Sequence, residues 1–450
     1  MHKIISMALL VLLTSNFQIV QAKQPFPSTY KMTAADDMLF IHATILTGDG
    51  LRLDDASVYV KSGKIAKVGE FDIPQNVTVI DMTGKWLTPG IIDVHSHLGV
   101  YPSPNIWATS DGNEMTSAVT AQVWAEHSIW PQDPQFEAAL AAGVTTLQIL
   151  PGSANLIGGR AVTVKNVSSV SVQGMKFPDA PHGLKMACGE NPKRVYGKNK
   201  KRAPSTRMGN VAGYRAAWIR AQKYRAEWDE YHADIEAGEE SKEPKRDLQL
   251  ETLAEVLRGN ILVHNHCYRA DEMMQMMDMA DEFGYKVTAF HHAIEAYKIA
   301  DKLAEKDVCS AMWADWWGFK LEAYDTVREN AAMVDKAGAC AIIHSDSPVG
   351  IQRLPQEAAK VMGAAALKGL NISPQHAMTW LTLNPAKALG IANKTGSITA
   401  GKMADLVLWD GSPFSVYSHV EQVYIDGALM FDRTDENYQP VRDFMLGQGL

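Results

Sequence analysis

The sequence predicts an α/β protein in which a distorted TIM-type (β/α)8 barrel carries a small β-sandwich domain built from both chain ends. Two observations lead to this prediction. From residue 250 onward, helical patterns alternate with short apolar runs, an order typical of a parallel sheet, and about eight such repeats close into a barrel. Near both chain ends, by contrast, short alternating runs are bounded by glycine and aspartate, as in the strands of a small sheet.

The start of the chain is typical of a cleavable secretory signal, which we place at residues 1–22. Lys3 precedes an apolar run over residues 4–13, and a polar stretch then closes on Ala22. The apolar run is too short to cross a bilayer, and no cysteine lies near Ala22 to carry a lipid. We therefore expect export, most simply to a bacterial periplasm, without a membrane anchor.

The two chain ends are expected to form one domain. We assign residues 23–89 and 386–450 to this composite β domain, because strand-like runs occur in both segments and can pair. Residues 90–385 are then inserted between them as the barrel. The strand-like runs lie at residues 39–41, 56–60, 64–68, 77–80, 404–409 and 420–427.

Within the barrel, one long insertion interrupts the alternation of helices and strands. A helix over 136–142 and a strand over 143–150 come first, and residues 182–190 read as a further strand that ends on Glu190. Residues 193–249 then form the insertion. Its first part is basic and its second part is helical and charged, which is typical of a solvated surface helix.

Composition argues against a nucleic-acid partner and against a disulfide framework. The chain has 43 lysine and arginine residues against 51 aspartate and glutamate, a net charge of -8. A nucleic-acid partner is not expected, because its phosphates need a basic face. Four cysteines are too few for a disulfide framework, and each lies in or beside an apolar run, so we expect them to be free and buried.

The chemistry is organised around His95 and His97, which end an apolar strand-like run. Side chains alternate along a strand, so the two imidazoles point the same way and can reach one metal ion. Other chemically active residues follow later strand-like runs, and the carboxyl ends of parallel barrel strands converge on one face. These further candidates are Lys185 or Glu190, His264 or His266, His291 or His292, and Asp346.

Imidazole and carboxylate ligands suit a divalent metal ion, and we expect zinc first, because zinc accepts both and lowers the pKa of bound water to about 7. The carboxylate of Asp346 can take the proton from that water and return it to a leaving nitrogen. The pattern therefore predicts hydrolytic chemistry on a small-molecule substrate.

Several motifs together resemble the amidohydrolase superfamily, close to its imidazolonepropionase-like and Xaa-Pro dipeptidase-like branch. The resemblance implies a distorted barrel, a β domain from both termini and one or two metal ions at the strand ends. It also implies hydrolysis of an amide, peptide or cyclic amide bond. The matching segments are TPGIIDVHSH (88–97), HSD (344–346), NPAKALG (384–390), GSI (396–398) and GKMADL (401–406).

Carried over to this sequence, the resemblance makes His95 and His97 the first-strand ligands. Asp346 becomes the last-strand ligand and general base. For the fifth strand His266 is preferred to His264, since it stands at the end of the run, and for the sixth His292 is preferred to His291. At the fourth strand we favour Glu190 over a carboxylated Lys185, because Glu190 lies nearer the predicted strand end and needs no modification.

The sequence also offers candidate substrate contacts. An aromatic cluster that includes Trp313 and Trp317 follows the seventh strand and can line an apolar pocket. Arg194, Tyr196 or Arg207 can meet a substrate carboxylate. A homo-oligomer is expected from the resemblance alone. The alternatives to an amide hydrolase are a deaminase of an aromatic amine and a barrel that binds metal or ligand without catalysis.

Overall fold

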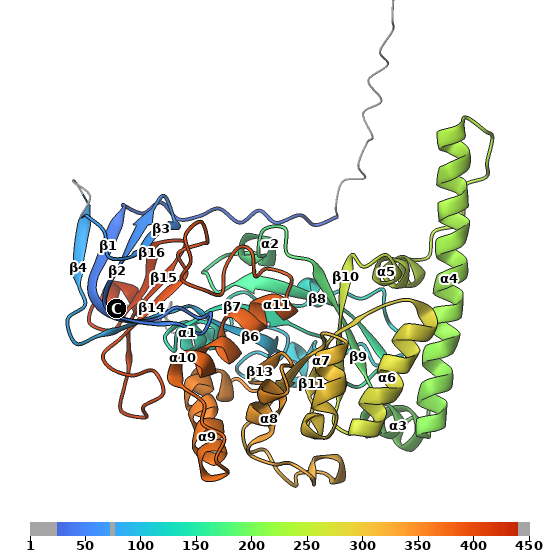
Figure 1. Ribbon diagram of the computed structural model, residues 1–450. Coiled ribbons are helices and arrows are strands. Elements are labelled where there is room, and N and C mark those ends of the chain that lie inside the picture. Colours follow the sequence, from blue (N-terminus) through green and yellow to red (C-terminus); the bar gives the residue numbers. More distant parts are fainter. Residues whose placement is uncertain (1–24, 73–76, 440–450) are drawn as a thin grey trace, which may run out of the picture.

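The computed structural model describes residues 25–72 and 77–439. The expected signal segment, residues 1–22, lies outside the described residues. Figure 1 shows a barrel surrounded by helices and, beside it, a second domain made of strands from both ends of the chain. The predicted fold class, an α/β barrel with a small β domain, is confirmed.

The barrel is built on a sheet in which every strand lies beside its neighbour in sequence. The strand order is β13-β12-β11-β10-β9-β8-β7-β6. The strands are β6 (Ile91–Ser96), β7 (Val144–Ile149), β8 (Ile157–Lys165), β9 (His182–Ala187), β10 (Ile261–Cys267), β11 (Val287–His292), β12 (Cys309–Met312) and β13 (Ala341–Ile343).

One strand departs from the parallel arrangement. β8 is antiparallel to both β7 and β9, whereas β6 and β7 run parallel, as do β9 and β10. Only residues 150–156 connect β7 to β8, and a parallel return needs a crossover of a dozen or more residues. The chain must therefore turn back on itself, and the barrel is distorted here. The pattern of alternating helices and strands contained no signal for β8.

The first and last barrel strands meet just beyond β13. The backbone N–H of Asp346 donates to the carbonyl of His95 at 3.0 Å, and the Ser345 hydroxyl donates to the same carbonyl at 3.2 Å. These bonds bring the residues that follow β13 against His95 at the end of β6.

The second domain is one sheet that joins the two ends of the chain. Its order is β16-β15-β14-β5-β1-β2-β3, with β4 paired to β1. The antiparallel pair of β5 and β14 links the N-terminal and C-terminal parts. The strands are β1 (Met38–Leu46), β2 (Arg52–Lys61), β3 (Lys64–Gly69), β4 (Thr78–Asp81), β5 (Trp86–Pro89), β14 (Leu406–Trp409), β15 (Val420–Ile425) and β16 (Ala428–Asp432).

Helices cover the outside of the barrel, as in α6, whose buried face includes Met273, Met276 and Met277. These methionines are therefore packing residues. The helices are α1 (Pro134–Leu140), α2 (Val172–Met175), α3 (Glu190–Lys193), α4 (Arg207–Ala237), α5 (Leu248–Leu257), α6 (Ala270–Phe283), α7 (Ala300–Glu305), α8 (Asn330–Lys336), α9 (Leu354–Leu367), α10 (Pro374–Ala377) and α11 (Leu383–Ala388).

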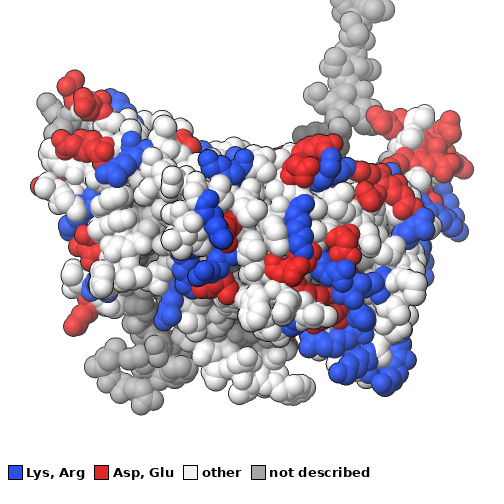
Figure 2. All heavy atoms as spheres, turned by 60° about the horizontal axis from the view of Figure 1, so that its bottom comes forward, with Lys and Arg blue, Asp and Glu red and all other residues white. Residues whose placement is uncertain are grey.

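The insertion contains α4, the longest helix among the described residues. Thr206 caps its start by accepting a hydrogen bond from the backbone of Gly209, and Gly238, with a φ of 78°, ends it. Its first half packs through buried residues such as Trp218, while its far end stands clear of the barrel in Figure 1. In Figure 2, lysine and arginine side chains gather where Figure 1 places α3 and the start of α4.

Among the described residues, no helix is both long enough and apolar enough to cross a bilayer.

A buried ion cluster joins the barrel to the second domain. The Nζ atom of Lys165, on β8, lies 3.1 Å from Asp405 Oδ1 and 2.9 Å from Asp426 Oδ2, with all three side chains almost fully buried. Tyr30 donates a further hydrogen bond to Asp426 at 2.5 Å. Because a buried charge is costly without partners, this cluster links the position of β8 to that of β14 and β15.

The cysteines form two disulfides, Cys188–Cys267 and Cys309–Cys340, so the expectation of free thiols was wrong. The reason is strand register. Ala187 of β9 pairs with His266 of β10, which puts the next residues, Cys188 and Cys267, side by side. Which strands become neighbours cannot be read from the spacing of cysteines along the chain.

Candidate metal centre

Three residues from the two ends of the barrel sheet form the first cluster at the mouth of the barrel. Asp346 Oδ1 lies 3.1 Å from His97 Nε2 and 3.3 Å from His95 Nε2. His95 is buried and the side chain of His97 is 18% exposed, so a small molecule can approach from the side of His97. These three residues can hold one metal ion.

A second cluster shares His95 and adds His292 and His344. The ring of His292 lies 4.8 Å from that of His95 and 5.0 Å from that of His344, measured between centroids. His292 also places its Nδ1 atom 4.0 Å from Asp346 Oδ2. The two clusters therefore surround one small volume.

Backbone conformation helps to aim two of these side chains. His292 has a φ of 71° and Asp346 a φ of 52°, in the left-handed region that residues other than glycine rarely adopt. Such conformations are unfavourable by about 1–3 kcal/mol each and are concentrated at functional sites.

His266, the preferred fifth-strand candidate, lies beside the second cluster. Its ring centroid is 4.5 Å from that of His292, and its Nε2 atom is 3.3 Å from the side-chain amide nitrogen of Asn191. Its Nδ1 atom is buried and has no hydrogen-bond partner among the described residues. The structure thus brings His95, His97, His266, His292 and Asp346 to one place.

The two fourth-strand candidates are placed differently. Lys185, on β9, is buried, and its Nζ atom lies 3.3 Å from His95 Nε2. Burial lowers the pKa of Lys185 to about 8. Glu190 is not on the strand, because the chain turns at Gly189, with a φ of 78°, and Glu190 begins α3. Its side chain is 31% exposed, and its Oε1 atom lies 3.9 Å from Lys320 Nζ, outside both clusters.

The alternatives His264 and His291 lie deeper in the barrel and are fully buried. His291 Nδ1 is 2.8 Å from His95 Nδ1, and His291 Nε2 is 2.9 Å from His264 Nδ1. They contact the cluster from below and belong to neither group of candidate ligands.

Donor chemistry at the mouth fits a metal ion. Both ring nitrogens of His344, and Nδ1 of His292, are buried without a hydrogen-bond partner among the described residues. A buried imidazole nitrogen without a partner is costly, and a lone pair aimed at a divalent cation removes that cost. Burial also lowers the pKa of His95, His292 and His344, which keeps these rings neutral as ligands must be.

Known proteins are similar to this chain in fold and in sequence. The profile described as the amidohydrolase family matches residues 249–438. The crystal structure of an amidohydrolase from Thermotoga maritima is 38% identical, with a TM-score of 0.80, and the match covers 88% of this chain and 100% of that one. The chain belongs to the amidohydrolase family. It is a hydrolase that acts on carbon–nitrogen bonds.

Two curated relatives place this amidohydrolase more closely. Amidohydrolase tasK from Hapsidospora irregularis is 35% identical over 400 residues, which are 83% of this chain but only 40% of that protein. An imidazolonepropionase from Thermoplasma volcanium is 21% identical over 405 residues, 85% of this chain and 92% of that protein. The expected imidazolonepropionase-like branch is confirmed.

Sequence reasoning did not select two residues of this amidohydrolase that lie at the centre. His344 stands two residues before Asp346, a spacing like that of His95 and His97, and this pattern was the available signal. Asp93 is buried and accepts hydrogen bonds from the backbone of His95 at 3.1 Å and of Ser345 at 3.2 Å. Burial raises the pKa of Asp93 to about 7, and Asp93 holds the two ends of the barrel sheet in register.

The expected substrate contacts are only partly at the mouth. Trp313 stacks on His292 with centroids 4.3 Å apart, whereas Trp317 is 59% exposed and donates to the backbone of Tyr324. Tyr196 is buried and bonded to the Ser117 carbonyl. The structure thus brings one of these three aromatic residues against the candidate ligands.

The two arginines proposed as substrate contacts are also placed differently. The guanidinium of Arg207 is bonded to Glu272 at 3.0 Å and to Glu322, so two carboxylates of the protein already occupy it. Arg194 is exposed at the start of a short helical segment that follows α3.

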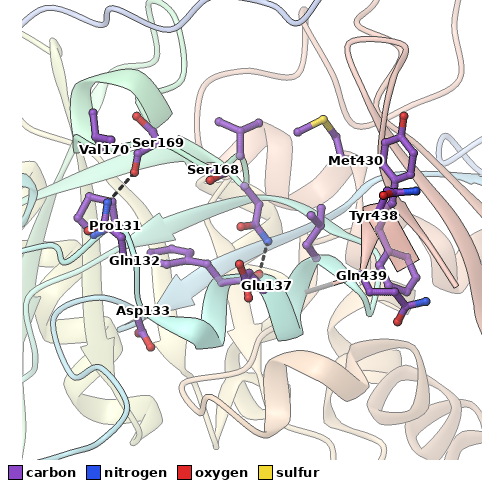
Figure 3. Close-up of a pocket in the computed structure, with 16 residues that line it drawn as sticks. Pro131, Gln132, Asp133, Glu137, Ser168, Ser169, Val170, Met430, Tyr438 and Gln439 are labelled. Atoms are coloured by element: carbon purple, nitrogen blue, oxygen red, sulfur yellow. Dashed lines mark hydrogen bonds between the residues drawn. The ribbon is translucent and has the colours of Figure 1, made fainter. Parts of the chain in front are cut away.

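A separate cavity of about 590 Å³ lies between α1 and the C-terminal strands (Figure 3). Gln132, Glu137, Ser169 and Tyr438 are among the residues that line it. None of the candidate metal ligands contributes to its lining. This cavity is therefore separate from the candidate metal centre at the barrel mouth.

Proposed function

We propose that this protein is an exported, metal-dependent hydrolase of an amide, peptide or cyclic amide bond, with Asp346 as the general base. The observation that carries the proposal is the position of the Asp346 carboxylate, 3.1 Å from His97 and 3.3 Å from His95 at the barrel mouth. A carboxylate among candidate metal ligands can bind the ion through one oxygen and accept a proton through the other.

Asp346 is ionised at neutral pH. Burial alone would raise its pKa, but the hydrogen bond from His97 holds the pKa well below its usual range. A bound divalent ion, for which we propose zinc, would supply a water molecule of lowered pKa. The carboxylate of Asp346 takes a proton and delivers it to the leaving nitrogen, because that nitrogen leaves readily only when protonated.

His95, His97, His266, His292 and Asp346 are the protein groups that would hold the ion or ions. For the fourth strand we propose Lys185, carboxylated on Nζ, in place of Glu190. The support is its position beside His95 Nε2 and its lowered pKa, because a neutral amine attacks carbon dioxide. The reaction forms an N–C bond, releases one proton and leaves a carbamate, whose oxygens would be available as metal ligands.

Substrates of this centre are expected to be small and to present an apolar or aromatic group next to the scissile bond. Tyr268 and Trp313 both stack on the ring of His292, with centroids 5.2 Å and 4.3 Å away. Phe319 packs against both of these aromatic rings. Aromatic side chains of this kind provide a rigid apolar wall.

Export is supported by a feature of the folded chain in addition to the signal-like start. The two disulfides are compatible with an oxidising compartment, where such bonds persist. We therefore propose a secreted or periplasmic location. Fractionation of cells that express the full-length chain, with detection of the cleaved N-terminus, tests this location directly.

The experiment that tests the activity uses the mature protein loaded with zinc and a panel of dipeptides, N-acyl amino acids and cyclic amides. We expect turnover of at least one class, and a loss of about 100-fold or more in kcat for Asp346→Asn, measured beside the metal content of both proteins. Release of ammonia would indicate a deaminase. Full activity in Asp346→Asn, or no turnover in the parent, would contradict the proposal.

A further inference from the structure

Two histidines that the proposed metal centre does not use form a buried chain beneath it. His95 Nδ1 contacts His291 Nδ1 at 2.8 Å, and His291 Nε2 contacts His264 Nδ1 at 2.9 Å. His264 Nε2 then lies 3.4 Å from the side-chain amide nitrogen of Gln148. Each of the four residues exposes at most 1% of its surface. We call this chain of His95, His291, His264 and Gln148 the histidine relay.

A contact between two ring nitrogens needs a proton on one and a lone pair on the other. A buried imidazolium without a counter-ion is costly, and no carboxylate contacts His264 or His291 among the described residues. Both rings are therefore neutral, with one proton each. Since each ring donates on one side and accepts on the other, the proton position on one ring sets the position on all of them.

The relay can point in two directions. In the first, the Gln148 amide N–H donates to His264 Nε2, so that His264 and His291 carry their protons on Nδ1. His95 then accepts at Nδ1 and carries its own proton on Nε2, which faces Asp346 Oδ1 at 3.3 Å. In this direction His95 has no lone pair to offer at the mouth of the barrel.

In the second direction, every bond is reversed. His95 donates from Nδ1 to His291, His291 donates from Nε2 to His264, and His264 donates from Nε2 to Gln148. The amide of Gln148 must then present its oxygen, a half-turn that exchanges two atoms of nearly equal size. With the amide placed as in the structure, Gln148 Oε1 is buried without a partner among the described residues, and the half-turn gives this oxygen a donor.

We propose that His291, His264 and Gln148 are positioning residues that keep the lone pair of His95 on Nε2, directed at the metal ion, and that the amide oxygen of Gln148 accepts the last hydrogen bond. The inference rests on the proposed metal centre, because only the second direction lets Nε2 of His95 bind an ion. Partners of this kind orient a ligating histidine and set its tautomer.

The chain offers variants that separate an acceptor from a space-filling role. Gln148→Glu retains an oxygen acceptor, whereas Gln148→Leu removes it and keeps a similar volume. Thr146→Val serves as the matched control, because Thr146 is a buried polar residue on the same strand that does not belong to the histidine relay.

The experiment measures the dissociation constant of Zn²⁺ for the mature protein, by competition with a chromophoric chelator. We expect Gln148→Leu to weaken binding by about 10- to 100-fold, while Gln148→Glu and Thr146→Val bind like the parent. In ¹⁵N-histidine NMR of the zinc-loaded parent, His291 should carry its proton on Nε2, with resonances assigned from His291→Gln and His264→Gln.

Equal weakening in Gln148→Leu and Gln148→Glu, unchanged binding in Gln148→Leu, or a proton on Nδ1 of zinc-loaded His291 would overturn the relay. These results leave the hydrolase proposal intact, because the parent still binds zinc. A zinc-binding parent that shows the expected pattern but hydrolyses nothing would support the relay and contradict the proposed activity. A parent that binds no zinc would overturn both.

Discussion

Lys185 Nζ lies 3.3 Å from His95 Nε2 at the centre of the barrel mouth, although the two residues come from the fourth and first barrel strands. Glu190, which the sequence favoured for the same role, has Lys320 as its charged neighbour instead. The identity of the fourth-strand group decides whether two metal ions can be bridged.

The first prediction concerns metal content. Lys185→Met should lose at least one of two bound ions, because it removes the amine that forms the proposed carbamate, whereas Glu190→Gln should keep both. Elemental analysis of proteins purified without chelator measures this. The opposite pattern, with loss only in Glu190→Gln, would transfer the bridging role to Glu190, and one ion in all three proteins would indicate a mononuclear centre.

Removal of the buried cation between the domains should destabilise the fold. Lys165→Met leaves Asp405 and Asp426 buried without their shared partner, which we expect to lower the free energy of unfolding by about 3–5 kcal/mol. As a control, Lys223→Met removes a lysine that is 79% exposed beside Glu227 and should change the free energy of unfolding by less than about 1 kcal/mol. Urea denaturation measures the free energy of unfolding of both variants, and similar losses would contradict the prediction.

Acid should destabilise the protein partly through His182. Burial and the charge of Lys176 lower its pKa from 6.5 to about 3. Between these values the unfolded state binds the proton and the folded state does not, so stability falls as pH decreases, by up to about 1.4 kcal/mol per pH unit. Urea midpoints between pH 6.5 and 4.5 should therefore fall more steeply for the parent than for His182→Gln. Parallel slopes would show that His182 titrates normally in the fold.

The two disulfides should differ in their effect on metal binding. Cys188–Cys267 joins the ends of β9 and β10 beside His266, whereas Cys309–Cys340 joins the starts of β12 and β13. Double serine variants of either pair should lose about 2–5 kcal/mol of stability. Only Cys188→Ser with Cys267→Ser should also weaken Zn²⁺ binding. Thermal unfolding and chelator competition measure the two effects. Equal zinc affinities in the two double variants would show that the Cys188–Cys267 disulfide does not contribute to metal binding.

Much of the architecture could be predicted because it depends on local pattern. The spacing of apolar residues marked β6, β7, β10 and β11 and the helices between the later strands. The same pattern showed that His95 and His97 end a buried strand. β8 was not predicted, because its direction depends on the short connection from β7 and not on its own residues.

The sequence by itself determined the fold class, the composite β domain and the set of polar residues at the barrel strand ends, since alternation and chain order are properties of neighbouring residues. Only the tertiary structure decided that Lys185 approaches His95 while Glu190 turns away at Gly189, that His344 joins His292, and that four cysteines pair. Each of these depends on strand register or on a single backbone turn. Both bring together residues that are far apart in the chain, and neither can be read from the spacing of residues along the sequence.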